Sequence, residues 1–190
     1  MVTPPPQPAC RNRDGQPTKA EMMEDSGPRR WAPLIAEAAR RFAIPPAWIG
    51  QVIDAESGGH AMLDGRPITS SKGAMGLMQV MPKTYDDMRR AFGLGHDPFD
   101  PHDNILAGTA YLRAMFDRFG GGVFAAYNAG PQRYQAYLDG RQALPQETVS
   151  YLAKLDQGAP IANQQPANAV FAPSGGELFF ASPGSRAHPG

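Results

Sequence analysis

Apolar side chains recur at helical spacing through the middle of this 190-residue chain, from about residue 30 to about residue 157. The clearest run places one large apolar or alanine side chain every three or four positions, as the buried face of a helix requires: Trp31, Leu34, Ile35, Ala38 and Phe42. Prolines stand where further runs begin, and a proline fits the first turn of a helix: Pro46, Pro82, Pro101 and Pro145. No segment shows the sustained alternation of a strand. The pattern predicts an all-α fold, a single small domain of about six helices with short connections.

Both ends of the chain differ from this middle part in composition. Residues 1–29 and 158–190 are rich in proline, glycine and polar side chains, and they carry few apolar residues. Such segments bury too little apolar surface to offset their chain entropy. We expect an N-terminal arm over 1–29 and a C-terminal tail over 158–190, both disordered, around one domain at 30–157. The stretch from Met1 to Asp14 lacks the apolar core of a secretory signal peptide.

The charge balance and the single cysteine narrow the function classes. The formal net charge is +0 and the isoelectric point is about 6.9, which disfavours a nucleic-acid binder because such proteins usually present a basic face. No run of about 18 apolar residues is long enough to predict a membrane span. Cys10 is the one cysteine, so the chain cannot form an internal disulfide.

Glu56 stands out because it continues an apolar stripe. Ile49, Val52 and Ile53 follow helical spacing, and one more helical step along the same face reaches Glu56. A glutamate is rarely buried unless it is paired or functional, and burial would raise its pKa. A carboxyl group that is still protonated near neutral pH can act as a general acid. The alternative is a helix-end glutamate whose side chain turns into solvent.

Three other segments carry polar groups among apolar or small residues. Residues 73–84 contain glycines, which allow the backbone to approach another group closely, and an amide at Gln79 among apolar neighbours. An ordinary glycine-rich turn before a helix would show the same pattern. Tyr127 and Asn128 could hydrogen-bond a sugar, or they could be a core tyrosine and a helix cap. Glu147 falls in a first helical turn, where the helix dipole alone would favour it.

Metal chemistry is not expected. The four histidines show no paired ligand spacing such as His-Glu-x-x-His, and they are His60, His96, His102 and His188. Asp97, Asp100 and Asp103 lack the calcium-loop pattern and are better explained as turn and cap residues. We therefore predict no metal and no cofactor.

The order of these segments is more specific than any one of them. Glu56-Ser57, then Gly-Leu-Met-Gln at 76–79, then Ala-Tyr-Asn-Ala-Gly at 126–130, then Glu-Thr-Val-Ser-Tyr at 147–151, resembles the lytic transglycosylase family with its SLT domain and goose-type lysozyme-like fold. The resemblance covers roughly residues 31–155. Met75 departs from it, since some soluble members have serine there. The loop at 60–71 also looks longer than the shortest family versions and could reshape the cleft.

The resemblance implies an enzyme with Glu56 as its single catalytic acid/base. It also implies a set of residues that bind the sugar substrate, namely Ser57, Gly76, Met78, Gln79, Tyr127, Asn128, Glu147 and Tyr151. The expected reaction cleaves the β-1,4 bond between N-acetylmuramic acid and N-acetylglucosamine in peptidoglycan and leaves 1,6-anhydromuramic acid ends.

Two rival functions stay open from the sequence. A lysozyme-like muramidase would hydrolyse the same bond, and a catalytically idle component would only bind peptidoglycan. By analogy with the family, the expected partners are the glycan strands and a secretion or conjugation apparatus of the cell envelope. The substrate implies action in the periplasm or cell envelope, although no export signal is visible.

Overall fold

The computed structural model describes residues 28–156. These residues form a helical body whose first half contains the 3-10 helix η1 (Pro28–Trp31) and the helices α2 (Ala32–Phe42), α3 (Pro46–Ser57) and α4 (Pro82–Phe92). The second half contains α5 (Pro101–Phe119), η2 (Gly120–Gly122), α6 (Val123–Ala129), α7 (Pro131–Leu138) and α8 (Gln146–Asp156). Between α3 and α4 lies a short antiparallel hairpin of β1 (Met62–Leu63) and β2 (Arg66–Pro67). The all-α prediction is confirmed, with this hairpin as a small addition.

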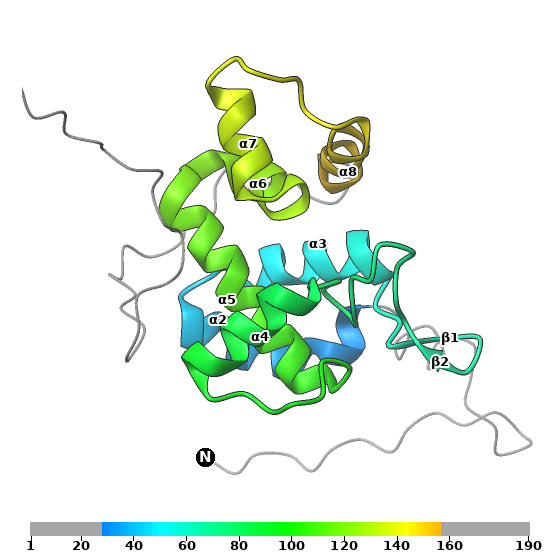
Figure 1. The fold of residues 1–190 in the computed structure, drawn as a ribbon. Helices are drawn as coiled ribbons and strands as arrows, with labels where there is room; N and C mark the ends of the chain where they lie inside the picture. The colour runs from blue at the N-terminus through cyan, green and yellow to red at the C-terminus, as the bar shows by residue number, and fades with distance from the viewer. Residues whose placement is uncertain (1–27, 157–190) are drawn as a thin grey trace, which may run out of the picture.

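Helix α5 is the central element of the body. It packs against α2, α4 and α6 (Figure 1). Asp100 begins α5 by accepting a hydrogen bond from the Asp103 N–H at 3.0 Å, as an N-cap residue does. Gly108 in the middle of α5 leaves room for Met78, because a Cβ atom there would lie 2.5 Å from the Met78 sulfur. The helix therefore accepts another segment directly against its backbone.

Prolines begin most helices, as the sequence predicts. The helices α3, α4, α5 and α7 begin at Pro46, Pro82, Pro101 and Pro131. An N–H at the first position of a helix has no acceptor within the helix, so a proline there costs no hydrogen bond. The sequence analysis does not predict α7, because a Gly-Pro pair such as Gly130-Pro131 is typical of the end of a helix. Pro131 ends one helix and begins the next.

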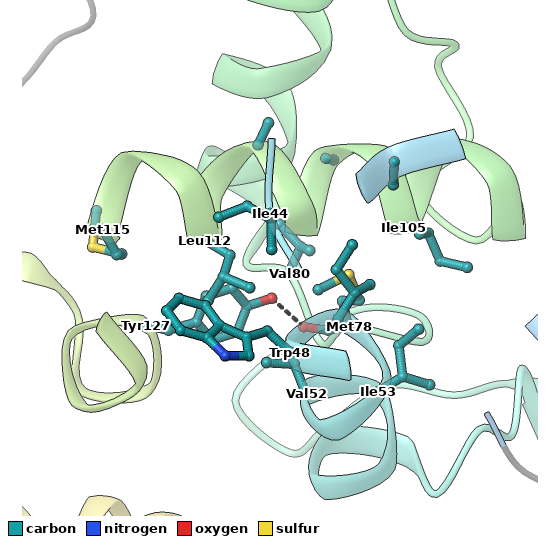
Figure 2. Packing of buried hydrophobic residues seen from close by; sticks show 14 of the residues in the cluster. Ile44, Trp48, Val52, Ile53, Met78, Val80, Ile105, Leu112, Met115 and Tyr127 are labelled. Atoms are coloured by element: carbon teal, nitrogen blue, oxygen red, sulfur yellow. Dashed lines mark hydrogen bonds between the residues drawn. The ribbon is translucent and has the colours of Figure 1, made fainter. Parts of the chain in front are cut away.

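The apolar core extends from η1 to α8, and the part between α3, α5 and α6 lies closest to the end of α3 (Figure 2). Ile49, Val52 and Ile53 on α3 are all fully buried, as the periodic stripe predicts. Trp48 packs edge to face against Phe124 of α6 at 5.2 Å between ring centroids. Because Trp48 is in the first turn of α3, this contact holds the N-terminal part of α3 against α6.

The predicted arm and tail lie almost wholly outside the described residues. Only Pro28 and Arg29 of the predicted arm are described, within η1. The domain boundaries at 30 and 157 therefore stay a prediction. Among the described residues, no helix has both the length and the apolar character to cross a membrane.

Candidate active site

Glu56 lies in the last turn of α3, one residue before the helix ends. The helix stops because Gly58 adopts the left-handed conformation, with φ of 61°, and its N–H caps the Asp54 carbonyl. The Glu56 side chain is half-buried at the end of the apolar face that begins with Ile49. The structure thus places the carboxyl where the periodicity predicts it.

Burial raises the pKa of Glu56 from its ordinary value of 4.5 to about 7. Loss of solvation is the largest cause, and the negative charge of Glu147 adds to it. The positive charge of Lys154 and hydrogen bonds from Tyr151 and Asn128 act in the opposite direction. A carboxyl group with a pKa near 7 can both give and accept a proton at neutral pH, which suits general acid and base chemistry.

Helices α6 and α8 supply the polar groups around this carboxyl. The Asn128 amide oxygen accepts a hydrogen bond from the Thr148 hydroxyl at 2.9 Å, which leaves its amide nitrogen for Glu56. Tyr151 is buried, and its hydroxyl has no hydrogen bond of standard length and angle among residues 28–156. Tyr151 is nevertheless close enough to Glu56 to lower the pKa of that carboxyl.

A tight turn at residues 75–80 lies beside the C-terminal end of α3, which carries Glu56. Met75 and Val80 exchange two backbone hydrogen bonds of 3.0 Å, and Gly76 and Gln79 in between have φ angles of 71° and 46°. Gln79 is half-buried and donates its amide N–H to the Gly76 carbonyl at 2.8 Å. A left-handed glutamine costs free energy that the surrounding structure must offset. The turn thus places the Gln79 amide at a fixed position.

Asn104 anchors that turn from α5. Its side-chain oxygen accepts the Met78 N–H at 2.9 Å, and its amide nitrogen donates to the carbonyls of Met75 and Pro98 at 3.0 and 2.8 Å. Asn104 is fully buried, so these bonds satisfy an otherwise costly amide. A Cβ atom at Gly76 would lie 2.4 Å from the Asn104 nitrogen. This contact explains why glycine stands there.

Two predicted site residues hold the turn with their own hydroxyls. Tyr127 is buried and donates to the Met78 carbonyl at 2.8 Å (Figure 2). Ser57 is buried and donates to the Leu77 carbonyl at 2.8 Å. Met78 itself is fully buried against α5. Ser57, Met78 and Tyr127 therefore support the site from inside the protein, and their predicted contact with substrate stays a prediction.

The structure brings three further predicted residues close to Glu56. Asn128 and Tyr151 contact its carboxyl, and Glu147 is close enough to influence its pKa. Glu147 is exposed and forms an ion pair with Lys72. The sequence analysis missed Lys154 and Lys72 as site residues and did not assign a role to Asn104. Lys154 could have been found, because it lies three positions after Tyr151 on the same face of α8.

A second titratable cluster lies at the start of α5. Ligand atoms of Asp100, His102 and Asp103 come within 4.8 Å of one another. Each is already used by the protein: Asp100 caps α5, Asp103 accepts the Gly95 N–H at 2.8 Å, and His102 contacts Glu37 at 3.1 Å. The prediction that the aspartates are cap and turn residues is confirmed for Asp100, which caps α5, and for Asp97, which accepts the Phe99 N–H at 2.9 Å in a local turn. Asp103 instead holds the preceding loop at Gly95.

The family model of the Transglycosylase SLT domain matches residues 33–150. The described body and the site around Glu56 fall almost wholly within that match. The chain belongs to the Transglycosylase SLT domain family.

Individual relatives agree with this assignment. The chain is 35% identical over 107 residues to the transglycosylase of Enterobacteria phage PRD1, covering 55% of this chain and 37% of that protein. It is 40% identical over 79 residues to the soluble lytic murein transglycosylase of Escherichia coli (strain K12), covering 37% of this chain and 12% of that protein. The chain therefore spans much less than two thirds of the length of these relatives.

Solved structures of the same family share the fold. The 70-kDa soluble lytic transglycosylase in complex with bulgecin A superposes with a TM-score of 0.59 at 27% identity, over 72% of this chain and 24% of that chain. The soluble lytic transglycosylase of Escherichia coli gives a TM-score of 0.54 at 27% identity, over 72% and 22%. The predicted lysozyme-like helical fold is confirmed.

Proposed function

We propose that this protein is a peptidoglycan lytic transglycosylase and that Glu56 is its catalytic acid/base. The single observation that carries this proposal is the state of Glu56, a half-buried carboxyl at a helix end with a pKa of about 7 and hydrogen-bond donors on α6 and α8. Membership of the Transglycosylase SLT domain family supports murein as the substrate. The place of action is then the bacterial cell wall, in the periplasm or cell envelope.

The proposed reaction uses Glu56 twice. Protonated Glu56 gives its proton to the glycosidic oxygen between N-acetylmuramic acid and N-acetylglucosamine, and that bond breaks. Most glycosidases use a second carboxylate to stabilise the developing cation. Glu147 is poorly suited to this role, because it is exposed and ion-paired with Lys72. In the proposed reaction the 2-acetamido oxygen of the muramyl unit stabilises the cation instead. Ionised Glu56 then takes the proton of the C6 hydroxyl, whose oxygen closes the 1,6-anhydro ring. Glu56 ends protonated, and no water is consumed.

The residues around Glu56 divide into two groups in this proposal. Gln79, Asn128 and Glu147 offer polar groups from three segments, so we assign them to the glycan. Ser57, Gly76 and Tyr127 keep the turn at 75–80 in place, each through an interaction within the protein. This assignment narrows the substrate-binding set that the sequence analysis predicts.

The chemistry of the product tests the proposal. Digestion of purified sacculi in ¹⁸O-labelled water should release muropeptides with 1,6-anhydro ends and no ¹⁸O, measured by mass spectrometry. A muramidase digest under the same conditions serves as control, since hydrolysis adds one labelled water at each new reducing end. Labelled reducing ends from this protein would establish the rival muramidase. Binding to sacculi without any cleavage would establish the idle peptidoglycan-binding component.

The machine that the protein serves is a separate question. A secretion or conjugation apparatus stays a prediction from family analogy alone.

A further inference from the structure

Lys72 lies at the tip of a tight turn beside the site. The Ser70 carbonyl accepts the Gly73 N–H at 2.9 Å, and the Ser70 hydroxyl accepts the Ala74 N–H at 3.0 Å. Gly73 takes a positive φ of 84°, which suits glycine at the end of such a turn. This turn leads directly into the turn at 75–80, so the backbone that carries Lys72 is held at both ends.

The Lys72 ammonium forms an ion pair with Glu147, which lies 75 positions further along the chain. Glu147 is in the first turn of α8, whereas Lys72 belongs to the segment between the β-hairpin and α4. The side chains are 67% and 62% exposed, and exposed ion pairs contribute little to stability. The ion pair therefore matters mainly for the position and charge of the two segments that it joins, the turn at 70–73 and the first turn of α8.

Glu147 is one of three polar groups on one face of α8. Glu147, Tyr151 and Lys154 follow one another at spacings of four and three, which places them on one side of the helix. All three influence the pKa of Glu56: Tyr151 and the positive charge of Lys154 lower it, and the negative charge of Glu147 raises it. From α6, Asn128 also lowers this pKa, and Tyr127 interacts electrostatically with the carboxyl. Glu147 is the only anionic group in this set, and Lys72 contacts it directly.

We propose that Lys72 is a positioning residue for Glu56: by pairing with Glu147 it holds the 70–73 turn against α8 and offsets a negative charge beside the catalytic carboxyl. The role of Lys72 in cleavage rests on the proposed function, whereas the electrostatic link does not. Without Lys72, Glu147 is free to turn toward Glu56 and its charge is uncompensated. The protonated form of Glu56 is then favoured, because a nearby like charge opposes ionisation.

A titration of Glu56 in the intact, substrate-free protein tests the link. The variant Lys72→Met keeps the length of the side chain and removes the charge, and NMR of the ¹³C-labelled carboxyl follows the titration. We expect the midpoint to rise by a few tenths of a pH unit, since the charges are partly exposed to solvent. Lys72→Arg should restore the wild-type midpoint. Lys83→Met is the matched control, because Lys83 is also exposed and paired, with Asp87 on α4. It should leave the midpoint unchanged.

The effect of Lys72→Met in a protein that also carries Glu147→Gln shows whether Lys72 acts through Glu147. We expect the rise caused by Lys72→Met to shrink or vanish there. An equal rise in both backgrounds, or no rise in either, overturns the proposal. For cleavage of sacculi, the high-pH limb of kcat/KM should move with the titration midpoint. If the midpoint moves but sacculi are never cleaved, the proposed function fails while the Lys72–Glu147 link stands.

Discussion

At the scale of single residues, the proposed mechanism makes both stability and activity depend on the protonation of Glu56. Its folded pKa of about 7 lies above the ordinary 4.5, so the folded state binds the proton more tightly than the unfolded state. The stability that this proton contributes is fully present below pH 4.5 and is lost as the pH rises to about 7. Above that window, the ionised carboxylate costs up to about 3 kcal/mol relative to the neutral form.

The variant Glu56→Gln should therefore be at least as stable as the wild type at pH 7.5, and the difference should disappear at pH 4. Gln is nearly isosteric and cannot ionise, but it can still hydrogen-bond Asn128 and Tyr151. Thermal unfolding at both pH values measures this. Cleavage of sacculi should fall by roughly 10²–10⁴-fold or more, because the only acid/base group is gone. A variant that is much less stable at pH 7.5 would show that Glu56 is an ionised structural partner, and near-normal cleavage would show that another residue is the acid.

Gly76 shows how closely the turn approaches α5. In Gly76→Ala, the new Cβ meets the Asn104 nitrogen at 2.4 Å, and alanine must also adopt a φ of 71°. Gly73→Ala is the matched control, since it imposes a φ of 84° with nothing within 4 Å of the Cβ. We expect the control to lose about 1 kcal/mol from the backbone conformation, and Gly76→Ala to lose about 2 kcal/mol more because buried hydrogen bonds of Asn104 break. Urea unfolding compares the two variants, and equal losses would contradict this account of Gly76.

At the scale of elements, α6 holds the turn at 75–80 through the hydrogen bond from Tyr127 to the Met78 carbonyl. Tyr127→Phe removes the bond to the Met78 carbonyl, and Tyr85→Phe removes comparable bonds to the carbonyls of Gly95 and Asp97 at 3.2 and 2.9 Å. Both variants should lose about 1 kcal/mol of stability. Only Tyr127→Phe should also lower kcat several-fold, because it loosens the segment that carries Gln79. Equal activity of the two variants would mean that the turn needs no support from Tyr127.

At the scale of the whole molecule, the described body should be sufficient for catalysis. Its core runs from Trp31 in η1 to Leu155 in α8. Among the residues that the structure describes, the groups that shift the pKa of Glu56 lie on α6 and α8 of this body. A shortened protein of residues 28–157 should therefore melt cooperatively and cleave sacculi at a rate similar to that of the full chain. Circular dichroism and the release of soluble muropeptides measure the two properties. A folded but inactive short form would show that residues outside 28–157 contribute to the site.

The sequence alone was sufficient for features that depend on local pattern. Helical spacing and proline positions predicted most helices. Both signals depend only on residues that are close in the sequence: apolar side chains three or four positions apart form one buried face, and a proline in the first turn costs no helical hydrogen bond. The stripe that ends at Glu56 predicted a buried carboxyl for the same reason. Pro131 shows the limit of such reasoning, since one proline can end a helix or begin the next, and packing of Tyr134 decided that it does both.

The tertiary structure decided which polar groups face the site and which face the interior. Ser57 and Tyr127 both carry hydroxyls in the motifs that predict the substrate site, yet each donates a hydrogen bond to a carbonyl of the 75–80 turn. Lys72 and Glu147 look like ordinary surface charges in the sequence, and they meet only because α8 folds back beside α3. A hydrogen bond or an ion pair depends on distances of a few ångströms. Local sequence patterns do not specify such distances between residues 75 positions apart, so only the folded chain determines them.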